Sequence, residues 1–452
     1  MRDNIHPARL TRSRRAHLLA VALLSGVVLV AGCTGSSGSP AAATSRGTAA
    51  PSLSAVTDCL LPPAGCYSPY LFRVAYGIQP LLDRGINGRG ETVTDLVPAV
   101  SNGPARSAII SAGSTSAQAG PPPGQPPAVT DIRQDLERFD SLFRLPAARI
   151  QVVTSLAGSA SPWQASDGAV GDLEMVHAVA PAATLRVVLM PLNFQNNAKD
   201  AAADMLAGLR LAVSHTDVAS ISFSLGEHYF TTAQVAEMHS ILLGAAAHHV
   251  TVIGSSGNGG WFSTPRGWGG LVKEVSLPAS DPLVLGVGGT TLTANSSTGA
   301  YIGENAWSDS GGGFSHLYAR PAYQDGVPGI SKTRGVPDVA GDADEAGGMA
   351  RVVTAGGVAS LESDPGTSDS APLWGGLVAL ADQYAHHDLG LVNPAIYSIG
   401  RSSSYHKAFH DITTGTNGYP AAPGWDPVTG WGTPDAQVLI PLLARFTSRS
   451  KT

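Results

Sequence analysis

The sequence predicts an α/β fold in which a mainly parallel sheet is covered by helices on both faces. The chain has 452 residues, of which 43% are hydrophobic and 14% are charged, so it can bury a large core. Short apolar runs alternate with longer helical patterns, which is typical of a parallel sheet. We therefore predict a single large domain over residues 67–448.

Strands and helices are expected to alternate up to about Gly288, and the C-terminal third is expected to consist mainly of Gly-rich loops with one clear helix, Ala371–His386. Short apolar or β-branched runs predict strands, and longer stretches with helical spacing predict helices. The strands are expected at Thr92–Val97, Ile150–Val153, Leu185–Leu189, Ala219–Ser224, Val250–Gly254 and Val284–Val287. The helices are expected at Asp131–Phe143, Asp167–Val179, Ala198–Ser214, Thr232–His248 and Ala371–His386. Residues 111–127, rich in Gly, Pro and Ser, predict a surface insertion.

Residues 1–32 have the pattern of an export signal. Five arginines precede the apolar run Leu18–Gly32, which is short for a membrane span and ends in small residues. Leu29–Cys33 (LVAGC) resembles a bacterial lipobox, in which the cysteine is lipidated. An uncleaved anchor helix is the alternative, and both would place the body of the protein outside the cytoplasm. Arg14-Arg15 leaves open whether export is general or uses the twin-arginine route.

Residues 33–66 predict a flexible tether held to the membrane through lipid on Cys33, because they are rich in Ser, Gly, Ala and Thr. Cys59 and Cys66 flank a short loop that a disulfide could close outside the cytoplasm; two unpaired thiols are the alternative. Without the five arginines and one aspartate of the signal, 23 basic and 33 acidic residues remain. This acidic balance argues against a nucleic-acid partner.

A serine at the start of the last predicted helix is the leading candidate nucleophile. The segment Gly366–Pro372 (GTSDSAP) is a turn of small residues that opens onto an apolar helix. Backbone N–H groups and the helix dipole favour negative charge at such a junction, which would help Ser368 to form an oxyanion. The alternative is that Thr367 or Ser368 merely caps the helix.

This motif resembles the nucleophile motif of subtilisin-like peptidases, and further motifs are similar to those of their acid-active relatives, the sedolisin (serine-carboxyl peptidase, S53) family. These motifs are Tyr70–Gly77, Leu277–Ala279, Val287–Leu292, Gly311–Ser315, Pro321–Gln324 and Arg334–Val339. The resemblance implies a subtilisin-like domain that cleaves peptide bonds, with a polypeptide substrate or a peptide ligand. No histidine lies in the His-Gly-Thr-His motif of subtilisins, and His177 is expected to pack in the core.

The general base is the point at which the sequence departs from the family. Sedolisins pair a Glu with an Asp four residues later, a spacing that puts both carboxylates on one helix face. The resemblance assigns Asp172 to the Asp position, and the Glu position then falls on Gly168, which cannot take a proton. Asp167 is rotated by about 140° from Asp172 around a helix. It either caps the helix or, if the helix starts after it, substitutes for the Glu.

Asn258 occupies the position at which sedolisins carry the Asp that donates to the oxyanion. An amide can donate a hydrogen bond without first taking up a proton. The alternative is that this Gly-flanked Asn only serves a turn.

The resemblance also implies a calcium (Ca²⁺) site. Its carboxylates would come from Asp411 and Asp426, and its carbonyl oxygens from Ile412, Ala422 and Gly424. Two solvated turn aspartates are the alternative.

Two functional hypotheses therefore remain open. Sedolisins carry a large N-terminal pro-domain, for which there is no room between Cys33 and Tyr67. The first hypothesis is a surface lipoprotein with serine-type endopeptidase activity through Ser368 and an altered base. The second is a catalytically inactive pseudo-peptidase that binds peptides or a cell-envelope partner.

Overall fold

A computed structural model describes residues 66–98, 129–154, 164–190, 198–262, 273–355, 358–363 and 365–449. All of them belong to the second of the two units of the chain, which spans Ala50–Thr452. The predicted export signal, the tether up to residue 65 and the insertion at 111–127 lie outside the described residues. Cys66 is disulfide-bonded, and Cys59 is also outside the described part. None of the described helices is both long enough and apolar enough to span a membrane.

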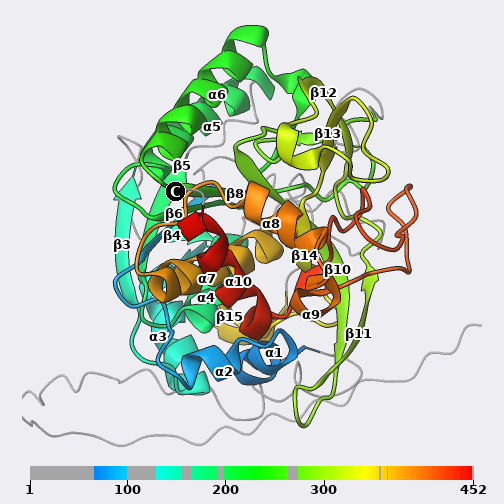
Figure 1. Ribbon diagram of the computed structural model, residues 1–452. Coiled ribbons are helices and arrows are strands. Elements are labelled where there is room, and N and C mark those ends of the chain that lie inside the picture. Colours follow the sequence, from blue (N-terminus) through cyan, green and yellow to red (C-terminus); the bar gives the residue numbers. More distant parts are fainter. Residues whose placement is uncertain are drawn as a thin grey trace, which may run out of the picture. The chain divides into compact units, whose positions relative to one another are not determined.

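An eight-stranded sheet forms the centre of the described unit (Figure 1). The strand order is β11-β10-β8-β6-β1-β5-β3, and β14 also pairs with β10. The strands are β1 (Thr92–Pro98), β3 (Arg149–Thr154), β5 (Thr184–Met190), β6 (Val218–Ile221), β8 (Thr251–Ser255), β10 (Val284–Ala294), β11 (Tyr301–Ala306) and β14 (Val339–Asp342). Every pair in this sheet is parallel except β10–β11, which confirms the predicted fold class.

The remaining elements surround this sheet. The helices are α1 (Pro69–Ala75), α2 (Gln79–Leu82), α3 (Ile132–Phe143), α4 (Asp167–Val179), α5 (Ala198–Ala212), α6 (Thr232–Ala247), α7 (Thr367–Ala385), α8 (Asn393–Gly400), α9 (Tyr405–Ala408) and α10 (Ala436–Arg449). Short 3₁₀ turns lie at Glu227–Tyr229 and Ala322–Gln324. Five two-stranded ladders pair β2 (Val129–Asp131) with β4 (Gln164–Ser166), β7 (Leu225–Gly226) with β9 (Ser276–Leu277), β12 (Gly313–Ala319) with β13 (Thr333–Val336), β15 (Arg351–Ala355) with β16 (Val358–Glu362), and β17 (Phe409–His410) with β18 (Thr433–Pro434).

Helices cover both faces of the sheet (Figure 1). Helices α5 and α6 pack on one face, and α4, α7 and α10 lie on the other. Side chains that alternate along β1 enter the two cores in turn: Val93 and Val97 face α4 and α7, whereas Leu96 faces α5 and α6. The sheet is therefore buried on both sides, as its apolar strands predict.

Helix α7 begins four residues earlier than expected, at Thr367 instead of Ala371. Pro372 removes one N–H from the helix without ending it. As a result Ser368 lies inside the first turn of α7 and not in the turn before it.

Helices α4 and α7 lie side by side and run in the same direction. A Cβ atom at Gly376 would lie 2.6 Å from the Val179 side chain, so the two helices touch there. Their C-terminal ends meet one loop: Gln383 accepts a hydrogen bond from the Gly88 N–H (2.7 Å), and a Cβ at Gly88 would lie 2.9 Å from Ala180. Both N-terminal ends therefore point toward the end of the sheet at which β1 finishes.

A buried ion pair explains one of the family-like motifs. Arg334 and Asp338 are fully buried, and the guanidinium donates to both carboxylate oxygens, at 2.9 and 2.7 Å. Asp338 also accepts hydrogen bonds from the Gly286 N–H and the Tyr397 hydroxyl. The pair thus joins β13, β10 and α8, and removal of either partner would leave an uncompensated buried charge.

Candidate active site

Ser368 and Asn258 lie next to each other at the N-terminal end of α7. The Asn258 side-chain oxygen accepts hydrogen bonds from the Thr367 N–H (2.9 Å) and the Thr367 hydroxyl (2.8 Å). Because a backbone N–H can only donate, this contact fixes which side of the amide carries the oxygen. A Cβ at Gly366 would lie 2.5 Å from Ser368 Oγ and 3.0 Å from Asn258 Nδ2, so the hydroxyl and the NH₂ group line the same small space.

This corner of the molecule is suited to hold a negative charge. Among the residues that the structure describes, none accepts a hydrogen bond from the Ser368 N–H. The Ser368 N–H, the Asn258 NH₂ group and the N-terminal end of the α7 dipole therefore surround one position. Such donors stabilise the oxyanion of acyl transfer.

The capping alternative for this motif is wrong. The N-cap residue of α7 is Gly366, so neither Thr367 nor Ser368 caps the helix. The Thr367 hydroxyl instead contacts Asn258 and accepts a hydrogen bond from the Gly257 N–H (3.1 Å). Asn258 in turn bonds to α7 through these contacts, and so does more than serve its own turn.

Asp172 lies at the same end of the helix pair as Ser368. It precedes Val179 by seven residues, and Ser368 precedes Gly376 by eight, so both are about two turns from the point where the helices touch. Asp172 is 4% exposed. Gly168 lies in the first turn of α4 and offers no side chain.

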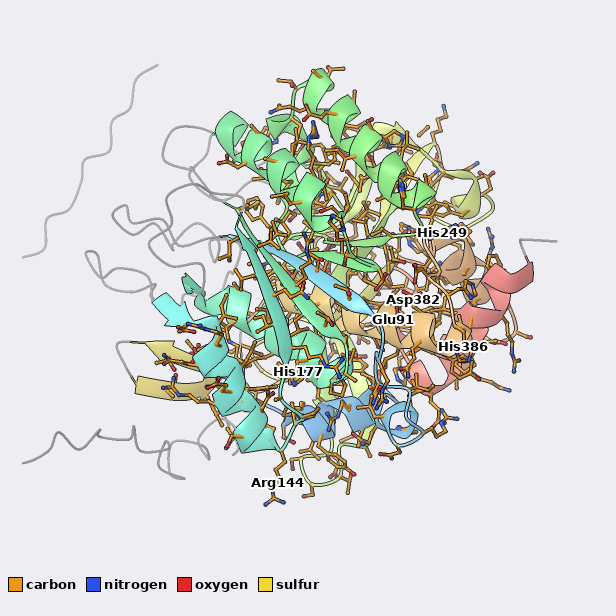
Figure 2. All side chains as sticks on the ribbon, turned by 90° about the vertical axis from the view of Figure 1, so that its left-hand side faces the viewer. Glu91, Arg144, His177, His249, Asp382 and His386 are labelled. Carbon is orange, nitrogen blue, oxygen red and sulfur yellow. The ribbon has the colours of Figure 1, made fainter. Side chains whose placement is uncertain are left out.

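The structure does not meet the condition under which Asp167 was expected to replace the missing Glu. Helix α4 begins at Asp167 itself and not after it. The side chain of Asp167 lies outside the described part of the structure. His177, by contrast, is a core residue as expected (Figure 2): it is fully buried, and its Nε2 lies 2.9 Å from the Pro146 carbonyl and 2.9 Å from Asp140 Oδ1.

Asp95 is a buried carboxyl that the sequence analysis missed. It lies on β1 between Val93 and Val97, on the face covered by α4 and α7, and is fully buried. Its Oδ1 accepts a hydrogen bond from Ser222 (3.1 Å), whereas Oδ2 has no partner among the described residues. Burial raises the pKa of Asp95 to about 7, against the opposing hydrogen bond from Ser222.

A cavity of about 410 Å³ lies beside the segment that carries Asn258. Its lining residues include Trp261 (three residues after Asn258), Gly312 and Phe314 of the Gly311–Ser315 motif, and the charged residues Lys273 and Glu274. The Lys273 ammonium lies over the rings of Trp261 (4.3 Å) and Tyr419 (4.6 Å). The cavity thus combines apolar walls with one basic and one acidic residue.

The two loops expected to bind calcium meet each other. Asp411 accepts hydrogen bonds from the Gly424 N–H (3.0 Å) and the Tyr405 hydroxyl (2.9 Å). Asp426 accepts four hydrogen bonds from its own loop, and burial raises its pKa to about 6. Within the described residues no backbone N–H donates to the carbonyls of Ile412, Ala422 and Gly424. These free carbonyls and the Asp411 carboxylate suit a hard cation such as calcium. Asp426 is less suited to be a ligand, because its carboxylate oxygens already accept four hydrogen bonds.

The fold is that of a sedolisin-type α/β peptidase domain. The crystal structure of Pseudomonas sedolisin, a serine-carboxyl proteinase complexed with two molecules of pseudo-iodotyrostatin, superimposes with a TM-score of 0.65 at 24% identity. The superposition covers 86% of this chain and 98% of that one.

Sequence comparison identifies the relatives. Kumamolisin of Bacillus sp. (strain MN-32) is 35% identical over 304 residues, which cover 62% of this chain and 51% of kumamolisin. Sedolisin of Pseudomonas sp. (strain 101) is 36% identical over 208 residues, or 42% of this chain and 34% of sedolisin. Human tripeptidyl-peptidase 1 is 29% identical over 269 residues, or 53% of this chain and 45% of that protein. No protein-family model matches the chain.

The chain is therefore a homologue of the sedolisin-family serine-carboxyl peptidases, and these alignments span about half or less of the length of the relatives.

The buried Asp95 carboxyl predicts a pH-dependent stability. Its pKa is raised in the folded state, so the unfolded chain releases this proton at lower pH than the folded protein does. The stabilisation is full below about pH 4 and is lost as the pH rises toward 7. We expect the free energy of unfolding of Asp95→Asn, relative to wild type, to rise by roughly 1–3 kcal/mol between pH 4 and pH 7.

Urea unfolding at several pH values measures this difference. Asp325→Asn, which removes an exposed carboxyl from a surface ion pair, is the matched control and should show no such trend. A constant difference between Asp95→Asn and wild type across the pH range would contradict the prediction.

Proposed function

We propose that this chain hydrolyses peptide bonds through Ser368 as a serine-carboxyl-type endopeptidase with a weakened general base. Homology to sedolisin and kumamolisin supports the reaction class. The observation that carries the proposal is the orientation of Asn258, whose oxygen is held by Thr367 so that its NH₂ group faces the side of the Ser368 hydroxyl.

In this reaction the Ser368 oxygen attacks the carbonyl carbon of the substrate. The Asn258 NH₂ group and the Ser368 N–H donate to the oxyanion that forms. Asp172 is the carboxyl that α4 retains to take the serine proton. Gly168 offers no second carboxyl four residues before Asp172, so in this proposal the base assistance, typically worth about 10²–10⁴-fold, is reduced.

The cavity beside Asn258 is the candidate site for one side chain of a polypeptide substrate. Phe314 and Trp261 offer apolar contact, and the Lys273 ammonium favours a carboxylate or a carbonyl group at its mouth. The complex of Pseudomonas sedolisin with pseudo-iodotyrostatin supports a peptide-like ligand for this fold.

A second candidate function is peptide binding without hydrolysis. The absence of a side chain at Gly168 favours it, because the alignment with the family then leaves Ser368 without the group that removes its proton. The partner would be a peptide or a component of the cell envelope.

We also propose that calcium binds between the Asp411 and Asp426 loops and that lipid on Cys33 anchors the protein outside the cytoplasm. The free carbonyls of Ile412, Ala422 and Gly424 support the first proposal. The order of basic residues, apolar run, small residues and cysteine supports the second.

Gly168→Glu tests the proposed reaction. The variant places a carboxylate four residues before Asp172, on the same helix face. We expect cleavage of an unfolded protein substrate at pH 3–5 to rise by roughly 10²–10⁴-fold over wild type. Gly168→Gln is the matched control, since it adds the same bulk without a base and should not raise the rate. Ser368→Ala should remove both the cleavage and the labelling by a serine-directed probe.

Two outcomes would contradict this account. Strong cleavage by wild type that Gly168→Glu does not improve would mean that another residue is the base. If Asp167→Asn then abolished this cleavage, the base would be Asp167.

No cleavage by any variant, together with peptide binding by both wild type and Ser368→Ala, would mean that the protein binds peptides without hydrolysing them.

Removal of calcium should lower the melting temperature, because the ion binds the native loops and not the unfolded chain. We expect Asp411→Asn to bind one calcium ion fewer than wild type by equilibrium dialysis. Asp411 is a better choice than Asp426, which already holds its own loop through four hydrogen bonds. Equal calcium binding by wild type and Asp411→Asn would show that the Asp411 and Asp426 loops do not bind calcium.

Cys33→Ala should release the protein from the membrane fraction or leave its precursor unprocessed, because lipidation requires the thiol. Fractionation and metabolic labelling with a fatty acid measure this. Unchanged partitioning and an unchanged precursor size would exclude the lipid anchor.

A further inference from the structure

Four carboxyl groups gather at the end of α7 opposite to Ser368. Glu91 directly precedes β1, Asp217 directly precedes β6, and Asp388 lies in the loop after α7. One carboxylate oxygen from each of these three residues lies within 4.8 Å of the other two. Asp382, in the last turn of α7, is fourteen residues after Ser368, or about 21 Å along the helix. The group is therefore separate from the candidate active site.

Asp382 provides an observation independent of these three residues. It is 1% exposed, and its Oδ1 accepts a hydrogen bond from the Leu389 N–H (2.9 Å). Its Oδ2 is buried and has no hydrogen-bond partner among the described residues. A buried carboxylate oxygen without a partner is costly, which points to a missing ligand.

Asp382 interacts electrostatically with the other three carboxyls. Its pKa is raised well above the usual range, first by burial and then by the negative charges of Glu91, Asp388 and Asp217. Figure 2 shows Asp382 beside Glu91. Asp382 therefore lies near the three carboxyls, although it is not one of the residues whose oxygens lie within 4.8 Å of one another.

No positive charge in the described part of the chain offsets this cluster. None of the ion pairs formed by described residues includes Glu91, Asp217, Asp382 or Asp388. The C-terminal end of α7 adds the negative end of its dipole at the same place. One oxygen of Asp217 is held by the Thr92 N–H (2.7 Å), which fixes that carboxylate at the start of β1.

We propose that Glu91, Asp217 and Asp388 bind a calcium ion, with the unpartnered oxygen of Asp382 as a further ligand. Calcium prefers carboxylate oxygens at about 2.3–2.6 Å, so ligands on opposite sides of the ion are about 5 Å apart. Oxygens that already lie within 4.8 Å of one another need little movement to reach this arrangement. The smaller magnesium ion, at about 2.0–2.1 Å from its ligands, would require them to close in further.

A bound ion would tie the starts of β1 and β6 to the C-terminal end of α7. The same helix carries Ser368 at its other end. The ion would therefore hold the helix on which the candidate nucleophile sits. This inference depends neither on the proposed peptidase activity nor on the Asp411 loops.

Calcium stoichiometry in the full chain tests the proposal directly. We use Asp411→Asn as the background, so that the other proposed site does not contribute, and measure bound calcium by equilibrium dialysis after treatment with a chelator. We expect one calcium per chain in this background, and its loss in both Asp411→Asn/Asp388→Asn and Asp411→Asn/Glu91→Gln. No bound calcium in the background, or calcium that both second substitutions leave in place, would overturn the proposal. Tighter binding of magnesium than of calcium would overturn the choice of ion.

The melting temperature provides a second readout. The sign of its change in Asp388→Asn distinguishes a calcium site from a cluster of carboxylates that only repel one another. Without calcium, Asp388→Asn should be as stable as the background or more stable, because one like charge is removed. With calcium in excess it should be less stable, by roughly 2–5 °C, because the ligand set is broken. Asp325→Asn should show neither effect. A variant that is more stable under both conditions would show that the cluster binds no calcium, and Glu91→Gln repeats the test if Asp388→Asn does not fold.

Discussion

The contact between α4 and α7 is the constraint on which the rest of the site depends. At Gly376 the helices approach so closely that a methyl group would lie 2.6 Å from Val179. This contact, together with the shared loop at Gly88, sets the two helices parallel and fixes their relative height. Ser368 and Asp172 therefore lie at the same end of the helix pair, and a larger residue at position 376 would separate them by separating the helices.

The interior of the domain is built with carboxyl groups that favour the protonated form. Burial is the first cause that raises the pKa values of Asp95, Glu174, Glu304 and Asp342. Glu304 accepts hydrogen bonds from Tyr76 and Thr290, and Asp342 holds the Leu292 N–H. Each of these groups stabilises the fold at pH values below the pKa that it has in the unfolded chain. This stabilisation is lost as the pH rises through the higher pKa that the group has in the folded protein. These four groups therefore favour the folded state more at low pH than at neutral pH.

The sequence predicted the alternating strands and helices before Gly288 well, because their periodicity is local, but it missed α8, α10 and the strands that follow β10, where Gly-rich loops were expected. It predicted the site less completely, because the site brings together residues that are far apart in the sequence. Helix α4 has the expected bounds, and β1 differs by one residue. Asp95 was missed because a single acidic residue in an apolar strand does not reveal what covers it. The cluster of Glu91 and Asp388 joins positions almost 300 residues apart, which only the topology brings together. One signal was available: Glu91 and Asp217 each directly precede a strand, and parallel strands begin at the same edge.

In the proposed reaction, the residues at positions 258 and 168 would act in the same direction. An aspartate in the place of Asn258 would have to be protonated before it could donate to an oxyanion, whereas the amide donates at any pH. A Glu four residues before Asp172 could share a proton with it and so raise one pKa, whereas Gly168 offers no carboxyl. In the proposed reaction both residues would therefore weaken the dependence on acid. The buried carboxyls retain that dependence in the scaffold, so stability and chemistry need not have the same pH optimum in this chain. If the proposed reaction at Ser368 takes place, we expect its rate to fall less toward neutral pH than the stability contributed by the buried carboxyls does.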